Sequence, residues 1–190
     1  MSKFSEESLL LIRNWDAYRD IVEAGNNLKP ELRALIPDIK KRLQGQKWWN
    51  NKWVMADQQE NPDAIQICFW DSRDTDDGRM IWVGVENLTP DAVFGNSLPT
   101  MFVWICDKLP DLKAELKRII RAGGNPIVGE WDASQNSQYI IRKSMSTCLP
   151  EEIDRLEDMI FDQLAEFCGY YAQFSDQFNK AVQKQLKTNK

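Results

Sequence analysis

The chain has 190 residues, of which 43% are hydrophobic and 28% are charged, and its formal net charge at pH 7 is −5. This length and composition are typical of one soluble domain, and we expect a single domain over residues 1–190. The chain contains no histidine. That absence excludes Ser-His-Asp triads, Cys–His pairs and HExxH zinc sites within this sequence.

The four cysteines, Cys68, Cys106, Cys148 and Cys168, show no CxxC spacing. Cys68 and Cys106 lie within apolar runs, so we expect buried thiols in a reducing compartment. The first residues lack a basic region followed by an apolar one, and no signal peptide is expected. The sequence contains no run of eighteen apolar residues, so no membrane-spanning helix is expected. These features favour a cytoplasmic protein.

Two helices are predicted in the N-terminal part of the chain. Residues 5–24 form a loosely amphipathic pattern, and the Gly-Asn-Asn run at 25–27 is expected to end that helix. A second helix is expected from Pro30, which suits a first helical turn. Pro37 is expected to kink or split it. Residues 47–55, with three tryptophans, are predicted to form a strand or a tight hairpin.

Strands are predicted in the middle of the chain. Residues 65–70 and 80–86 alternate in polarity, and the polar loop 71–78 between them closes with Asp-Gly, which predicts an antiparallel pair. Residues 87–99 are rich in turn formers and are predicted to form a loop. Residues 101–106 are nearly all apolar, which indicates a central strand buried on both faces.

Residues 110–122 are predicted to form a short helix, followed by short strands at 127–131 and 138–143. The order of elements predicts an α+β fold. It has a mostly antiparallel mixed sheet of about five to six strands. The N-terminal helices, one short internal helix and a long C-terminal helix pack on this sheet.

The C-terminal helix is predicted to begin near Pro150. Its apolar stripe repeats at about 3.67 residues, whereas a left-handed coiled coil requires 3.5. A helix lying across the sheet as far as about Phe178 therefore fits better than a coiled-coil arm. A bend at Gly169 is an alternative to a continuous helix. Residues 179–190 are expected to form a frayed polar tail.

The chain lacks GxSxG, SxxK and Walker motifs, and we expect no cofactor and no bound metal. The principal hypothesis is a non-catalytic, cytoplasmic binding or regulatory protein that acts through protein–protein contacts. Its partner is another protein or a second copy of the chain. The residues predicted to contact that partner are aromatic: Trp48, Trp49, Trp53, Phe161 and Tyr170.

A first alternative is a metal-dependent enzyme on nucleic acid. Glu86, Asp107, Glu130 and Asp132 lie at predicted strand ends, where gathered carboxylates can hold Mg²⁺ for phosphodiester chemistry. The order of elements in the middle of the chain is similar to the core of PD-(D/E)xK nucleases, which implies an active nuclease or a degenerate, non-catalytic relative of that architecture. The acid-x-Lys triplet of those enzymes is not matched after Glu86, because Leu88 occupies the lysine position.

A second alternative is a nucleic-acid binder through residues 29–53. Basic residues there are interleaved with tryptophans, a pattern that can track a phosphate backbone and stack bases. The candidate basic residues are Lys40, Lys41, Arg42, Lys47 and Lys52. The acidic balance of the whole chain argues against a dedicated nucleic-acid binder, because affinity depends largely on phosphate neutralisation.

Overall fold

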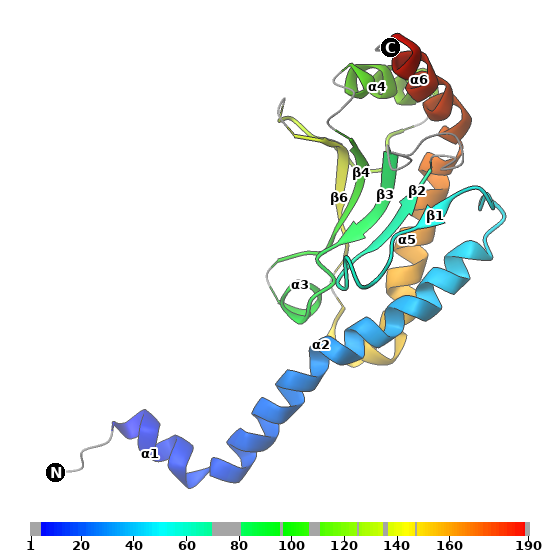
Figure 1. The fold of residues 1–190 in the computed structure, drawn as a ribbon. Helices are drawn as coiled ribbons and strands as arrows, with labels where there is room; N and C mark the ends of the chain where they lie inside the picture. The colour runs from blue at the N-terminus through cyan, green and yellow to red at the C-terminus, as the bar shows by residue number, and fades with distance from the viewer. Residues whose placement is uncertain are drawn as a thin grey trace.

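The computed structural model describes residues 5–69, 81–95, 97–106, 111–124, 126–134, 137–146 and 148–188. Within these residues, six strands form one antiparallel sheet in the order β1-β2-β3-β4-β6-β5. Helices pack against the sheet and around its ends (Figure 1). The predicted α+β class with a long C-terminal helical region is confirmed.

The strands are β1 (Val54–Met55), β2 (Ile65–Cys68), β3 (Ile81–Glu86), β4 (Thr100–Ile105), β5 (Glu130–Trp131) and β6 (Tyr139–Ser144). The predicted antiparallel pairing of β2 with β3 is confirmed, with Ile67 opposite Val83. β4 lies between β3 and β6, and its neighbouring residues Met101, Phe102 and Val103 are all buried, as expected for a central strand. The segment 47–55 is a strand only at its last two residues.

The helices are α1 (Glu6–Arg13), α2 (Trp15–Gln44), α3 (Pro90–Phe94), α4 (Leu112–Ala122), the 3₁₀ helix η2 (Pro150–Arg155), α5 (Leu156–Ala172) and α6 (Ser175–Thr188). α5 packs against β3 and against α2, while α4 packs against β6 and α6. α3 lies within the segment predicted to be a loop. It forms because the Thr89 side chain accepts a hydrogen bond from the Ala92 N–H and Pro90 starts the first turn.

α2 is one helix of 30 residues, which corrects the expected stop at residues 25–27. Its break from α1 lies at Asn14, whose φ of −115° and ψ of 31° depart from helical values. Pro37 does not break α2 either. Proline has no N–H to donate to the carbonyl four residues earlier, and here Gln58 Nε2 donates to that Arg33 carbonyl over 3.1 Å. A side chain from outside the helix thus replaces the missing backbone bond.

The C-terminal helix continues through Gly169 and breaks instead at residues 173–174, between α5 and α6. Gly169 allows the indole of Trp48 to pack closely against the α5 backbone, because a Cβ there would lie 2.8 Å from Nε1 of Trp48. Residues 175–188 form α6, with Phe178 and Val182 fully buried. The expected frayed tail is therefore wrong as far as Thr188, since the apolar face of α6 packs on α4.

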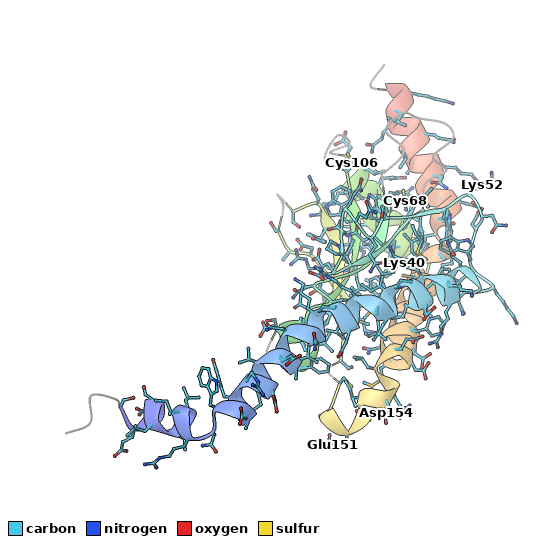
Figure 2. All side chains as sticks on the ribbon, turned by 60° about the horizontal axis from the view of Figure 1, so that its bottom comes forward. Lys40, Lys52, Cys68, Cys106, Glu151 and Asp154 are labelled. Atoms are coloured by element: carbon cyan, nitrogen blue, oxygen red, sulfur yellow. The ribbon has the colours of Figure 1, made fainter. Side chains whose placement is uncertain are left out.

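The N-terminal part of the chain leaves the body of the protein. α1 and the first half of α2 extend away from the sheet and the other helices (Figures 1 and 2). Every residue from Leu10 to Glu31 is exposed, and the first buried residue of α2 is Leu32. We call residues 5–31 the N-terminal arm. Within the described residues, no helix combines the length and hydropathy needed to cross a membrane.

Substitution of Gly169 tests the packing of Trp48 on α5. Gly169→Ala is expected to lower the free energy of unfolding by about 1–3 kcal/mol, because the added methyl group overpacks the contact with the indole. Urea denaturation measures the change. Glu166→Ala, at an exposed position on the same helix, is the control and should change stability by less than about 0.5 kcal/mol. Equal effects of the two substitutions would contradict the assigned role of Gly169.

A double-mutant cycle tests how α2 accommodates Pro37. Gln58→Ala is expected to cost about 0.5–1.5 kcal/mol, because the Arg33 carbonyl loses its donor. In a Pro37→Ala background the cost should be smaller, since the N–H of residue 37 then takes that carbonyl. Urea denaturation of the four chains measures the coupling, and purely additive effects would argue against it.

Candidate protein-docking site

Large apolar side chains of the described residues are exposed mainly on the N-terminal arm. Their exposed fractions range from 37% at Leu28 to 70% at Ile21. The set comprises Leu10, Leu11, Ile12, Trp15, Tyr18, Ile21, Val22 and Leu28. A contiguous apolar surface of more than a few hundred Å² is uncommon on a monomer and marks an interaction site.

Three of the exposed apolar residues of α2, Trp15, Tyr18 and Val22, belong to a regular seam, and Ile21 and Leu28 lie beside it. Its positions alternate in steps of three and four, so the mean period is about 3.5 residues, as in a left-handed coiled coil. The seam runs through Trp15, Tyr18, Val22, Gly25, Lys29, Leu32, Ile36, Ile39 and Leu43. From Leu32 onward it is buried in the same core cluster as α5. We call it the α2 seam: its C-terminal half is covered and its N-terminal half is exposed.

A groove of about 300 Å³ lies where the arm joins the body. Its apolar lining is Leu28, Leu32 and Leu35 of α2, Phe94 of α3, and Ile153 and Leu156 at the start of the C-terminal helices. Phe94 and Ile153 are exposed. Glu31, Asp154 and Glu157 complete the lining, and Figure 2 labels Asp154 in the turn that leads into α5. We call this the root groove. It meets the α2 seam at Leu32, while Leu28 and Leu35 line it from beside the seam.

Arg42 fixes α5 to α2 beside the root groove. Its guanidinium lies 2.9 Å from Glu157 and 2.8 Å from Asp158, and its Cζ lies 3.9 Å from the centre of the Phe161 ring. Phe161, which was predicted to contact a partner, is therefore half-buried beneath Arg42. These contacts hold the wall of the groove at a fixed position relative to α2.

The predicted tryptophan contact segment packs against the body. Trp53 is buried and stacks on Phe69 with ring centres 4.3 Å apart. Trp48 and Trp49 are half-buried, with ring centres 6.3 Å and 5.7 Å from that of Trp53. Tyr170 is also half-buried. These rings have a packing role in the structure, and their contact with a partner stays a prediction.

The basic segment is partly engaged within the fold. Lys40 Nζ donates to the Ala56 carbonyl over 2.9 Å, and burial lowers the pKa of this ammonium group. Arg42 is paired as described above. Lys41, Lys47 and Lys52 are exposed. Lys40 and Arg42 therefore have structural contacts within the fold, and a nucleic-acid role for the segment stays a prediction.

Two described carboxylates of the metal hypothesis, Glu86 and Asp132, contact different side chains, and both act electrostatically on Tyr139. Glu86 accepts a hydrogen bond from the Tyr139 hydroxyl over 2.8 Å, and Asp132 lies 3.3 Å from Nε of Arg142. Glu130 is exposed on β5, and Asp107 lies outside the described residues. Among the residues described, no group of three or more Cys, Asp or Glu side chains is placed to hold a metal ion.

Glu86 lines a cleft of about 240 Å³ together with aromatic and amide side chains: Asn61, Gln66, Trp82, Phe102, Trp104 and Tyr139. Burial first, and then the hydrogen bond to Glu86, raise the pKa of Tyr139 to about 12. The contact therefore holds this tyrosine protonated beside a carboxylate.

No family model matches this chain, and neither a curated protein nor a solved structure matches it. Its function is therefore argued from its own residues.

The sequence did not lead to the candidate docking residues of the arm. The alternation of three and four from Trp15 to Leu43 is present in the sequence and was the available signal. The run at 25–27 and the two prolines interrupt that pattern, and they favoured two short helices over one long seam. Exposure of the seam's N-terminal half depends on where α5 begins beside α2. The local sequence of α2 carries no information about that position.

The pH dependence of stability tests the Tyr139–Glu86 contact. Unfolded tyrosine loses its proton near pH 10, whereas folded Tyr139 keeps it to about pH 12. The unfolded chain therefore binds fewer protons in this window, and the stability contributed by Tyr139 is full below pH 10 and falls toward pH 12. In urea denaturation at pH 9 and pH 11, Tyr139→Phe should lose less stability between the two pH values than the native chain. An equal loss in both chains would contradict the raised pKa.

Proposed function

We propose that this chain is a non-catalytic binding protein that acts through protein–protein contacts, with the N-terminal arm as its contact element. The observation that carries the proposal is the exposed half of the α2 seam. The same stripe that forms core contacts from Leu32 onward extends back to Trp15, and its residues Trp15, Tyr18, Val22 and Gly25 are exposed. Lys29, between the two halves, is paired with Asp63 of the body.

The magnitude of the exposed surface supports a partner. Burying one large aliphatic side chain completely contributes about 1.5–3 kcal/mol. Covering the exposed fractions of the eight side chains on the arm would therefore contribute on the order of 5–10 kcal/mol. Part of this is offset by the lost freedom of the two partners on association. The remainder is sufficient for a specific contact.

The composition of the arm also favours a partner. Gly25 lies in the interior of α2, where it costs about 1 kcal/mol relative to Ala, and Asn26 and Asn27 are weak helix formers. Pro30 removes a further backbone hydrogen bond. An isolated helix with these residues is marginal in water, so packing against a partner would stabilise the helical arm.

We propose that the protein works in the cytoplasm. Cys148 and Cys168 are reduced, buried thiols, and burial raises the pKa of both, which suits a reducing compartment. The metal-dependent alternative has less support, because Glu86 and Asp132 each contact a neighbouring side chain.

Site-specific photo-crosslinking tests the arm as the contact element. A benzophenone side chain is placed at Ile21, which is 70% exposed beside the seam, in the full-length chain within the cells that make it. The expected result is a covalent protein adduct, because the probe lies within the contact.

The matched control places the same probe at Glu23, two residues further along α2 and therefore on the opposite side of the helix. It should give little adduct. Equal yields from the two positions, or no adduct from Ile21, would refute the arm as the contact element.

A further inference from the structure

We propose that the exposed half of the α2 seam pairs with the same seam of a second copy, antiparallel about a two-fold axis, and that Trp15 of each copy occupies the root groove of the other. This inference rests on the proposed function and names the partner. A two-fold contact of this kind is self-complementary, because each copy supplies both the arm and the groove.

The period of the seam favours a helix as occupant. A seam of about 3.5 residues per step matches a supercoiled helix partner, whose side chains fit between those of α2. Over Trp15–Leu32 the seam is about 26 Å long. The stripe already meets α5 over its C-terminal half, so a helix on the exposed half continues an existing helix–helix contact.

The root groove selects the register of the two arms. In an antiparallel pair, the two seam positions of each heptad face each other across the contact. One such register places Trp15 opposite Leu32, Tyr18 opposite Lys29 and Val22 opposite Gly25 of the second copy. Trp15 is 57% exposed, and this register delivers its indole to the apolar lining around Leu32.

The break at Asn14 fits the same register. An incoming α2 is free to run along the arm only as far as the body, where Phe94 and Ile153 wall the groove. The chain leaves the α2 direction at Asn14, one residue before Trp15. At that point a straight continuation of α2 would meet the body of the second copy, and the break gives α1 a different direction.

Charge and size are compatible with this pairing. Beside the seam, Arg19 faces Asn26 and Ile21 faces Leu28 of the second copy. Of the acidic residues of this stretch, Asp16, Asp20 and Glu23 occupy the outer positions of the helix, and Glu31 lies at the root groove. The register shifted by one heptad is poorer, because it brings the two copies of Arg19 together and leaves the root groove without Trp15.

Gly25 has a role in this arrangement. A Cβ at this position would meet nothing within 4 Å in one copy, so the glycine is not required by intramolecular packing. Opposite Val22 near the two-fold axis, it permits close approach of the two helices. The Lys29 ammonium group lies 3.1 Å from Oδ2 of Asp63 in its own chain. The stem of Lys29 can lie along Tyr18 of the second copy while the ammonium group keeps that ion pair.

The expected size of the contact is that of a reversible dimer. Two seams paired over about 26 Å, with both root grooves filled, lie at the lower end of the roughly 1,200–2,000 Å² that specific interfaces bury. We expect dissociation in the micromolar range, within reach of sedimentation equilibrium.

The register is tested with a matched pair of substitutions at Asn26 in the full-length chain. Asn26→Glu places a carboxylate opposite Arg19 of the second copy, and Asn26→Lys places an ammonium group there; both residues are good helix formers. Two such pairs form per dimer, and the Kd should differ about tenfold between the variants, with Asn26→Glu the tighter. The difference should shrink at high salt.

Trp15→Ala tests the root groove. It should weaken the dimer at least tenfold, because a buried tryptophan is a typical interface hot spot. The thermal unfolding of the body should be unchanged at concentrations where both chains are monomeric, since Trp15 lies outside the core. Glu23→Lys, on the outer face of the arm, is the control and should leave the Kd within about threefold.

Three results would overturn the inference: a native chain that remains monomeric at 100 μM or about that concentration, equal Kd values for the two Asn26 variants, or an unaffected Kd in Trp15→Ala. An adduct at Ile21 with a different protein, from a chain that is itself monomeric, would refute the second copy and leave the proposed function standing. Absence of any adduct would refute both.

Discussion

Burial of Leu32, Ile36, Ile39 and Leu43 in the core fixes the direction of α2, and the rest of the N-terminal region follows from that direction. Because α2 is a single helix, its first half continues along the same axis after the core ends. The result is an apolar seam that is longer than the body that buries it. The arm therefore exists because α2 is continuous. Its exposed face carries the same seam that the core covers from Leu32 onward.

The body provides a firm base for this arm. Arg42 links α2 to Glu157 and Asp158 at the start of α5, and Trp48 packs against Gly169 near the other end of α5. α5 in turn packs on β3. Trp48 and Arg42, two of the residues predicted to contact a partner or nucleic acid, thus help to join α2 and α5. Their positions keep the root groove and the seam in a constant relation to each other.

Much of the fold was predictable because its signals are local or periodic. The alternation in β2 and β3 and the fully apolar β4 led to the antiparallel central sheet, which the structure confirms. The helix boundaries were less predictable. The run at 25–27 reads as a stop and Pro37 as a break, yet Gln58 supplies the bond that Pro37 lacks from a distant loop. Gly169 predicts a bend from the sequence, but in the structure its lack of a side chain leaves room for the indole of Trp48, which is remote in sequence.

The candidate site was the least predictable part, because exposure depends on the end of a neighbouring element. Trp15 and Trp53 are equally apolar in sequence, yet Trp15 is exposed on the arm and Trp53 is buried on Phe69. Trp15 is exposed because α5 covers α2 only from Leu32 onward. Trp53 is buried because it packs on Phe69, a residue remote from α2 in sequence. Whether a candidate contact residue is exposed thus depends on which elements pack on it, and that is a property of the tertiary structure.

Amide hydrogen exchange of the arm as a function of protein concentration tests the central claim most directly. Backbone amides of residues 18–29 should be protected at high concentration and should lose that protection on dilution, because the helix is marginal without a second copy. Amides of residues 36–43 should stay protected throughout. Rapid exchange of the arm at every concentration, or protection that does not change on dilution, would contradict the claim that the seam is covered by a second copy.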